Sequence, residues 1–173
     1  MPNPDDVAHV GHNGRFIRWM DRQTVHRDKL VHRSINVLVF HPDDGRLLIQ
    51  QRHRKKLTNP GHWDVSVAGH VDYSDHPEGD PHAALIAFER SAVRELREEI
   101  GICAELTPIG VFGPQPQVHY EVNALFRCES AGPFSIQEEE LESLRWVNAE
   151  ELRFISPRTS QLDWLAREIL GWC

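Results

Sequence analysis

The residues with the most readable chemistry are three glutamates in the charged run at 94–102. Glu95 lies three residues before Glu98 and four before Glu99, so on a helix the three carboxylates share one face. Their like charges repel one another. A hard divalent cation would relieve that repulsion, because Mg²⁺ prefers carboxylate, water and phosphate oxygens. The alternative is a solvated helix face on which arginines such as Arg94 pair with the glutamates.

A long helix is expected to carry these glutamates. Its start is predicted at Asp80-Pro81, where an N-capping residue precedes a proline, and its end at Gly101, a typical terminator. Apolar residues at helical spacing predict the buried stripe of this helix, which comprises Leu85, Phe88, Ala92, Val93, Leu96 and Ile100.

Strands are expected on both sides of this helix. Residues 35–40 and 47–51 flank the turn Asp43-Asp44-Gly45 and predict a hairpin, and residues 63–67 alternate as in a strand that ends at Gly69. The other expected elements are strands at 118–128 and 144–147 and a closing amphipathic helix at 160–170. This order of strands, helix, strands and helix indicates a mixed α/β sandwich.

Length and composition are those of one globular domain, with 173 residues, 40% hydrophobic and 26% charged. The net charge of −7 weighs against a nucleic-acid polymer as partner, because no basic surplus exists to displace counterions. No apolar run approaches the ~18 residues that span a bilayer. Three scattered cysteines favour a reducing, cytoplasmic location. Residues 1–14 are polar, with proline and glycine, and are expected to be loosely held.

The run Arg-Glu-Leu-Arg-Glu-Glu-Ile-Gly-Ile at 94–102 resembles the second half of the Nudix family signature at every defined position. The glycine turn Ala-Gly-His-Val at 68–71 and the late strand and helix start at 144–152 resemble that family as well. The resemblance implies a Nudix α/β/α sandwich with a central mixed β-sheet. It further implies a single domain at 30–173 that follows a partly ordered N-terminal extension at 1–29.

The chain departs from the signature upstream of Arg94. The signature expects a glycine fourteen and a glutamate eight residues before that arginine, where this sequence has Asp80 and Ile86. Gly69 lies 25 residues before Arg94, so about eleven residues are inserted, and the polar segment 72–82 is expected to hold them. The missing glutamate is either absent or replaced by one of two nearby residues, Glu78 and Glu89.

The resemblance implies hydrolysis of a nucleoside diphosphate-linked or other small diphosphate compound by water attack on phosphorus. It implies that Glu95, Glu98 and Glu99 bind Mg²⁺ or Mn²⁺. Arg94 is then expected to hold the glutamates in place as part of the catalytic set. The general base stays open, and its candidates are Glu98, the acidic run Glu138-Glu139-Glu140 and Glu121.

A second resemblance, to the isopentenyl diphosphate isomerase-like branch of Nudix hydrolases, rests on the basic loop before the glycine turn. Arg52, Lys56 and the segment Pro60-Gly61-His62-Trp63 resemble the loop and the Pro-Gly-x-Trp turn of that branch. The resemblance implies that the basic pair grips a diphosphate. The residues expected to bind substrate are therefore Arg52, Lys56, Gly69 and His70.

Histidines and glutamates bind a second metal in the isomerases. The residues of this chain that resemble that set are His26, His32, His70, His119 and Glu121. Such a set would suit zinc or another transition metal. His26 and His32 are six residues apart, where the isomerase spacing is seven. The alternative is that His70 caps or lines the pocket and the other histidines are solvated.

Two alternatives to hydrolysis remain open. The isomerases place a catalytic cysteine just before the Gly-His of the turn, where this chain has Ala68, so isomerase activity is disfavoured. A non-catalytic, nucleotide-sensing Nudix domain would have no need of three clustered carboxylates. The expected partner is a small-molecule diphosphate, with no nucleic-acid polymer and no membrane, and the resemblance is compatible with a homodimer.

Overall fold

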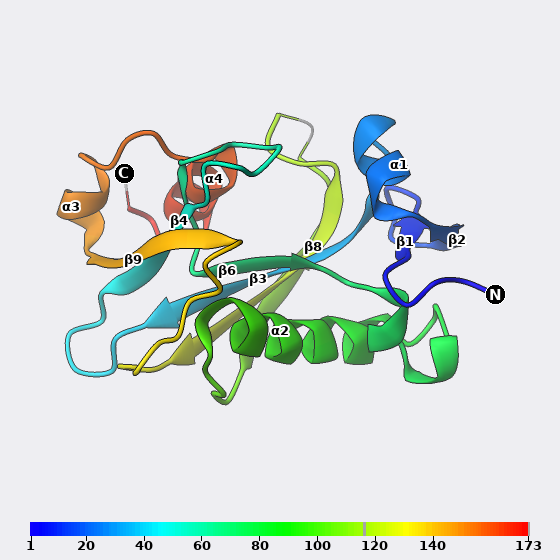
Figure 1. The fold of residues 1–173 in the computed structure, drawn as a ribbon, viewed down its shortest axis with the longest axis horizontal. Helices are drawn as coiled ribbons and strands as arrows, with labels where there is room; N and C mark the ends of the chain where they lie inside the picture. The colour runs from blue at the N-terminus through cyan, green and yellow to red at the C-terminus, as the bar shows by residue number, and fades with distance from the viewer. Residues whose placement is uncertain (116, 173) are drawn as a thin grey trace.

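The structure, a computed structural model, describes residues 1–115 and 117–172, in which one nine-stranded sheet lies between helices (Figure 1). The strands are β1 (Val7–Val10), β2 (Phe16–Met20), β3 (His32–Phe40), β4 (Leu47–Arg52), β5 (Trp63–Asp64), β6 (Val67–His70), β7 (Thr107–Phe112), β8 (Glu121–Glu129) and β9 (Leu141–Val147). The helices are α1 (Arg22–Arg27), α2 (Ala84–Ile100), α3 (Ala149–Leu152) and α4 (Ser160–Glu168), with 3₁₀ turns at Tyr73–Asp75 and Pro77–Gly79. No helix in the described ranges is long and apolar enough to cross a membrane.

Strand β3 is the centre of the sheet, and its register decides which residues meet at its start. It runs parallel to β8, beginning with His32 opposite Glu121. It also pairs antiparallel with β6, where Ser34 lies opposite His70. The pairing of β6 and β8 with β3 therefore brings His32, His70 and Glu121 to the same end of the sheet.

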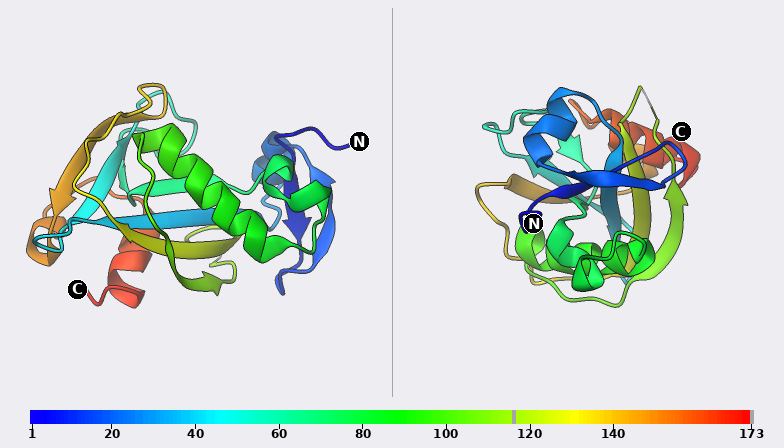
Figure 2. Two further views of the ribbon diagram at one scale, coloured as in Figure 1. Left: turned by 90° about the horizontal axis from the view of Figure 1, so that it is seen from below. Right: turned by 90° about the vertical axis from the view of Figure 1, so that its right-hand side faces the viewer.

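The two faces of the sheet are covered by different helices (Figure 2). Ile35 and Val37 of β3 pack with the apolar side of α2 in one core. Leu38, which points to the opposite face, packs with α4 in a second core. This alternation is the period-two pattern of a strand buried on both faces. The expected α/β/α sandwich with a central mixed sheet is confirmed.

Helix α2 ends at Gly101 as expected, but its start differs from the expectation. Gly101 adopts a left-handed conformation with φ of 72° and donates to the carbonyls of Arg97 and Leu96. The helix begins at Ala84 rather than at Asp80-Pro81. Asp80 instead caps a turn, because its carboxylate accepts a hydrogen bond of 2.8 Å from the backbone N–H of His82. An aspartate before a proline thus made a turn here and not a helix N-terminus.

The buried face of α2 also differs from the expected stripe. Leu85 and Val93 are exposed, at 75% and 39% of their surface. The residues that face the sheet are Ala87, Phe88, Ser91, Ala92, Glu95, Leu96, Glu99 and Ile100. These residues keep strict helical spacing, but the stripe contains two glutamates and a serine. A hydrophobicity pattern assigns Ser91, Glu95 and Glu99 to the solvent side, so the predicted buried face is shifted around the helix from the observed one.

Residues 7–10 form a buried strand, so the expectation of a loosely held segment at 1–14 is wrong for this part of it. Strands β1 and β2 form an antiparallel pair, and β1 joins β3 where His9 lies opposite His32. Val7 and Ala8 are fully buried and Val10 is 1% exposed. A strand of four residues is too short for periodicity to reveal. Helix α1 follows, capped by the carboxylate of Asp21 on the N–H of Thr24 at 2.9 Å.

The remaining strands match the expected positions with shifted ends. The hairpin of β3 and β4 is confirmed, and α4 is confirmed from Ser160 but ends at Glu168. The expected strand at 63–67 is divided into β5 and β6. Between them Ser66 donates to the carbonyl of Leu48 at 2.5 Å. Strand β7 was not expected, because a proline and a glycine within residues 107–112 hide its pattern.

Candidate active site

The carboxylates of α2 lie where this helix crosses β6. Glu95 and Glu99 are buried, with 9% and 7% of their surface exposed. The side chain of Glu98 is 51% exposed. Glu99 accepts a hydrogen bond of 3.0 Å from the side-chain amide of Gln50 on β4. One helix face therefore presents two buried carboxylates and one that reaches solvent, as the spacing predicts.

Gly69 on β6 leaves the space that Glu95 occupies. A Cβ atom at this position would lie 2.2 Å from Cδ and 2.3 Å from Oε1 of Glu95. Such distances are far inside van der Waals contact. Glycine is therefore required here because the carboxylate fills the place of a side chain, and not because of a left-handed backbone.

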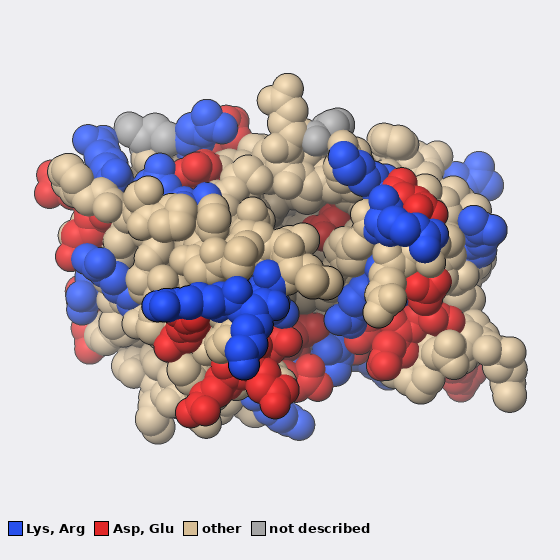
Figure 3. All heavy atoms as spheres, turned by 45° about the horizontal axis from the view of Figure 1, so that its top comes forward, with Lys and Arg blue, Asp and Glu red and all other residues tan. Residues whose placement is uncertain are grey.

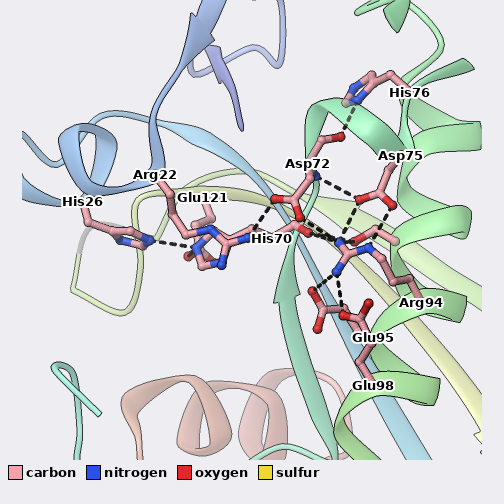
Figure 4. Close-up of polar contacts among 11 residues, drawn as sticks. Arg22, His26, His70, Asp72, Asp75, His76, Arg94, Glu95, Glu98 and Glu121 are labelled. Carbon is pink, nitrogen blue, oxygen red and sulfur yellow. Dashed lines mark hydrogen bonds and ion pairs between the residues drawn. The ribbon is translucent and has the colours of Figure 1, made fainter. Parts of the chain in front are cut away.

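Arg94 connects the glutamates of α2 with β6 and with the segment after it (Figure 4). Its Nη1 donates to Glu95 at 2.8 Å and to Glu98 at 3.1 Å. Its Nε and Nη2 donate to the two carboxylate oxygens of Asp75 at 3.0 and 2.8 Å, a bidentate pair. Its Nη2 also donates to the carbonyl of His70 at 3.0 Å. One guanidinium thus fixes the glutamates of α2 against both β6 and the segment that follows it.

Asp75 takes the place that the sequence expectation gave to Glu78 or Glu89. Among the ion pairs of the described residues, neither of those glutamates contacts Arg94. The signal was present in the sequence. The signature's glutamate stands six residues after its glycine, and six residues after Gly69 is Asp75. Counting back eight residues from Arg94 leads to Ile86 and misses Asp75, because the extra residues lie between Asp75 and Arg94.

The charges of this cluster are out of balance without a cation. Burial raises the pKa of Glu95 to about 7, against the opposing effect of Arg94, and the charge of Glu98 adds to the rise. Burial and the neighbouring Glu95 raise the pKa of Glu99 as well. Burial lowers the pKa of Arg94, but Asp75, Glu95 and Asp72 outweigh it and hold this pKa above its ordinary value. The site is thus built to hold more negative charge than Arg94 neutralises.

If the glutamates bind a metal as the sequence predicts, replacing Asp75 by asparagine is expected to lower kcat roughly tenfold, the scale on which partners of metal ligands act. The change keeps the shape of the side chain but removes the charge that holds Arg94. The free energy of unfolding should fall by roughly 1.5–3 kcal/mol, the value of a hydrogen bond to a charged group. Steady-state kinetics and urea unfolding measure the two effects.

The conservative change Asp75→Glu should restore most of the activity lost in Asp75→Asn. Glu78→Gln is the matched control, because Glu78 is exposed in the same segment. If Asp75→Asn keeps full activity, or if Glu78→Gln loses as much, Asp75 is not the residue that positions Arg94.

A cluster of histidines lies beside the carboxylates, at the end of the sheet where β3, β6 and β8 meet. The side-chain nitrogens of His26, His32 and His70 lie within 4.8 Å of one another. Nε2 of His26 and Nε2 of His70 are 2.8 Å apart. The carboxylate of Glu121 lies 3.6 Å from Nε2 of His32 and 4.0 Å from Nε2 of His70. The structure therefore brings together four of the five residues that sequence reasoning assembled.

The protonation of this cluster favours a ligand-binding form. Nδ1 of His32 lies 2.9 Å from the carbonyl of Leu30, which fixes the proton on Nδ1 and leaves a lone pair on Nε2. That buried Nε2 has no hydrogen-bond partner among the described residues. Burial lowers the pKa of His32 and, with the charge of His32, the pKa of His26 and His70. The imidazoles are thus neutral at neutral pH.

His119 does not join this cluster. Its Nδ1 accepts a hydrogen bond of 3.2 Å from the backbone N–H of Glu121, and its ring stands edge-on to Trp164. The solvated alternative for the other histidines is also wrong for His32, which is 2% exposed.

A cavity of about 320 Å³ opens beside the histidine cluster. Its walls come from α1, from the starts of β3 and β8, from the end of β6, from Asp64 of β5, from the loop after β4 and from the start of α4. Gly69, His70, Glu121 and Arg52 all line it. In Figure 3 this side of the molecule is hollowed near its middle, with acidic atoms visible inside.

The two basic residues expected to bind substrate differ in position. Arg52 lines the cavity, but its guanidinium is already bonded to Asp64 at 3.3 Å and to Thr58. Lys56 does not line the cavity within the described ranges and instead forms an ion pair with Glu140. The segment that carries Glu140 packs on the end of α2, where the backbone N–H of Gln137 donates to the carbonyl of Glu99 at 3.0 Å.

Known proteins resemble this chain in sequence and in fold. The NUDIX domain model matches residues 30–172. The isopentenyl-diphosphate delta-isomerase of Phaffia rhodozyma is 28% identical, over 99% of this chain and 74% of its own length. The Nudix hydrolase YfcD of Escherichia coli (strain K12) is 30% identical, over 83% of this chain and 73% of its own length. A crystal structure from Deinococcus radiodurans superimposes with a TM-score of 0.74 at 19% identity, covering 94% of this chain and 98% of that one.

The family match covers most of the chain, and it includes the carboxylate helix, the glycine turn and both sheet faces. The relatives named above are Nudix proteins or an enzyme that acts on a diphosphate, by their names. This chain therefore belongs to the Nudix family and is a hydrolase of the pyrophosphohydrolase kind.

Proposed function

We propose that this enzyme hydrolyses a nucleoside diphosphate-linked or similar small diphosphate by water attack on phosphorus, with Mg²⁺ or Mn²⁺ bound by Glu95, Glu98 and Glu99. The observation that carries the proposal is the arrangement of these carboxylates on one face of α2, two of them buried and all anchored by α2 and its neighbours. Oxygen ligands of this kind suit a hard divalent cation.

The charge of the site supports a cation at this position. Arg94 is shared between Asp75, Asp72 and two of the three glutamates, so it cannot neutralise the cluster alone. A bound cation would neutralise charge on the phosphate oxygens and lower the pKa of the attacking water. The chain's own residues supply position, since Arg94 holds Glu95 and Glu98 and Gln50 holds Glu99.

The proton of the attacking water needs an acceptor, and we propose two candidates for it. Glu98 is the carboxylate of the cluster that reaches solvent. Glu140 is paired with Lys56, and its segment contacts the end of α2 through Gln137, whose N–H donates to the carbonyl of Glu99 at 3.0 Å. Glu121 belongs to the histidine cluster instead, and Glu138 and Glu139 are exposed beside Glu140.

The test is a panel of diphosphates incubated with the purified protein and Mg²⁺ or Mn²⁺. At least one nucleoside diphosphate derivative should release a monophosphate, and removal of the metal with a chelator should abolish release. The Glu98→Gln variant, purified in parallel, reports any contaminating phosphatase. If every panel member survives with each metal, the hydrolase proposal fails. Conversion of isopentenyl diphosphate to its isomer would favour the isomerase alternative, although neither described cysteine, Cys103 or Cys128, lines the cavity.

We also propose that His26, His32, His70 and Glu121 hold a second cation, of the transition-metal or zinc kind. The free lone pair of the buried His32 Nε2 and the close approach of neutral imidazoles support this site. Titration with Co²⁺ should produce visible absorption bands typical of nitrogen ligands. His26→Ala should weaken that binding at least about tenfold. His119→Ala is the matched control, and equal loss in both variants would contradict the assignment.

A further inference from the structure

We propose that Arg22 of α1 is a positioning residue for the carboxylate cluster, and that it acts through Asp72 and Arg94. By binding Asp72, it keeps this buried carboxylate from drawing Arg94 away from the glutamates of α2. The inference rests on the proposed function, because the carboxylates that it concerns are the proposed Mg²⁺ ligands.

Asp72 lies between two arginines that come from different helices (Figure 4). Its Oδ1 accepts a hydrogen bond of 2.8 Å from Nη2 of Arg22, and its Oδ2 lies 3.3 Å from Nη2 of Arg94. The second distance is beyond the ordinary N–H···O limit of about 3.2 Å. Burial raises the pKa of Asp72, and Arg22 opposes that rise more strongly than Arg94 does. Asp72 is therefore bonded to Arg22 and only approaches Arg94.

The guanidinium of Arg94 cannot turn towards Asp72 without a loss elsewhere. Its Nη2 donates to Asp75 at 2.8 Å and to the carbonyl of His70 at 3.0 Å, so both hydrogens of this nitrogen have acceptors. A guanidinium is planar and rigid, so a turn of Nη2 also turns Nη1. Nη1 is the nitrogen that donates to Glu95 and Glu98. A stronger bond to Asp72 would therefore displace the proposed metal ligands.

Arg22 reaches Asp72 from a helix whose position is fixed. It is the first residue of α1, which Asp21 caps, and Val25 of this helix is fully buried. His26 follows one turn later and lies in the histidine cluster. Residues four apart share a face of a helix, so one face of α1 borders both clusters of the site.

Loss of Arg22 would leave Asp72 with one partner. The carboxylate is only 6% exposed, and among the ion pairs of the described residues its other cation is Arg94. A buried charge is costly unless it is paired and hydrogen-bonded. Asp72 would then compete with Asp75 and the glutamates for the same guanidinium.

The test is a calorimetric titration of the full chain with Mg²⁺. Arg22→Met, which keeps the length of the side chain and removes the charge, should weaken Mg²⁺ binding roughly tenfold, the scale on which partners of metal ligands act. Removing a positive charge near a cation site would by itself strengthen binding. A weaker affinity therefore reports position and not charge. Arg22→Lys should restore most of it.

A double-mutant cycle identifies the route of the effect. Asp72→Asn removes the charge that would compete for Arg94, so Arg22→Met should cause no further loss of Mg²⁺ affinity in that background. Arg27→Met is the matched control, because Arg27 lies on the same helix and its one ion pair among the described residues is with Asp28. Unchanged or tighter binding in Arg22→Met, or an equal loss in both backgrounds, overturns the inference.

Two further variants separate the possible failures. Thermal unfolding identifies an Arg22→Met protein that does not fold, and Arg22→Gln then takes its place in the cycle. Glu99→Gln should abolish Mg²⁺ binding, because it changes a proposed ligand. If Glu99→Gln binds Mg²⁺ as the wild type does, the proposed metal site itself fails. If it abolishes binding and the Arg22 variants bind normally, only the role of Arg22 fails.

Discussion

Glu98→Gln is expected to lower kcat by at least about 100-fold, the scale of losing one charge-stabilising group at a preorganised site. Glutamine keeps the size of the side chain and its contact with Arg94, so the fold should be preserved. It removes the negative charge at the one carboxylate of the cluster that reaches solvent. Glu99→Gln is expected to act similarly, because Glu99 shares the proposed metal.

The measurement is steady-state hydrolysis of the best substrate of the panel at saturating Mg²⁺. Glu89→Gln is the matched control, an exposed glutamate on the same helix that should keep wild-type activity. Wild-type kcat in Glu98→Gln and Glu99→Gln would remove the carboxylate cluster from the mechanism. A loss of activity in Glu89→Gln would instead support Glu89 as the upstream glutamate of the signature.

Gly69→Ala should lose activity on a similar scale while the protein remains folded. The added methyl group would lie 2.4 Å or less from three atoms of the Glu95 side chain, so that carboxylate must move away. The backbone of Gly69 does not need a left-handed conformation, and the strand should tolerate alanine. The damage is therefore confined to the position of one carboxylate.

A double-mutant cycle separates this effect from a general defect. If the methyl group acts through Glu95, then Gly69→Ala together with Glu95→Ala should be no less active than Glu95→Ala alone. Gly113→Ala is the control, because a Cβ there meets no atom within 4 Å. Additive losses in the double variant would mean that Gly69 matters for another reason.

The parts of the site that are local in sequence could be predicted from it. Glu95, Glu98 and Glu99 lie within one turn and a half of helix, so their shared face follows from spacing alone. Gly101 as the helix end follows from the same local chemistry. Asp75 was missed because the extra residues between it and Arg94 change the spacing of the signature.

The residues of the histidine cluster could be predicted only as a list of candidates, because the fold decides which of them meet. The resemblance gathered His26, His32, His70, His119 and Glu121. The pairing of β3 with β6 and β8 brings His32, His70 and Glu121 together, and His26 reaches them from α1. The ring of His119 stands edge-on to Trp164 instead. The cavity had no signal in the sequence, because its walls come from segments that lie far apart along the chain.

Asp72 connects the N-terminal residues to the proposed catalytic centre. Its carboxylate bonds Arg22 of α1 at 2.8 Å and lies 3.3 Å from Arg94 of α2. The family match starts at residue 30, after both Arg22 and His26. A fragment cut at that boundary would retain every carboxylate of α2 and yet lose a wall of the cavity, one imidazole and the outer partner of Asp72. We therefore expect the smallest active fragment of this chain to begin before residue 22 and not at the boundary of the family match.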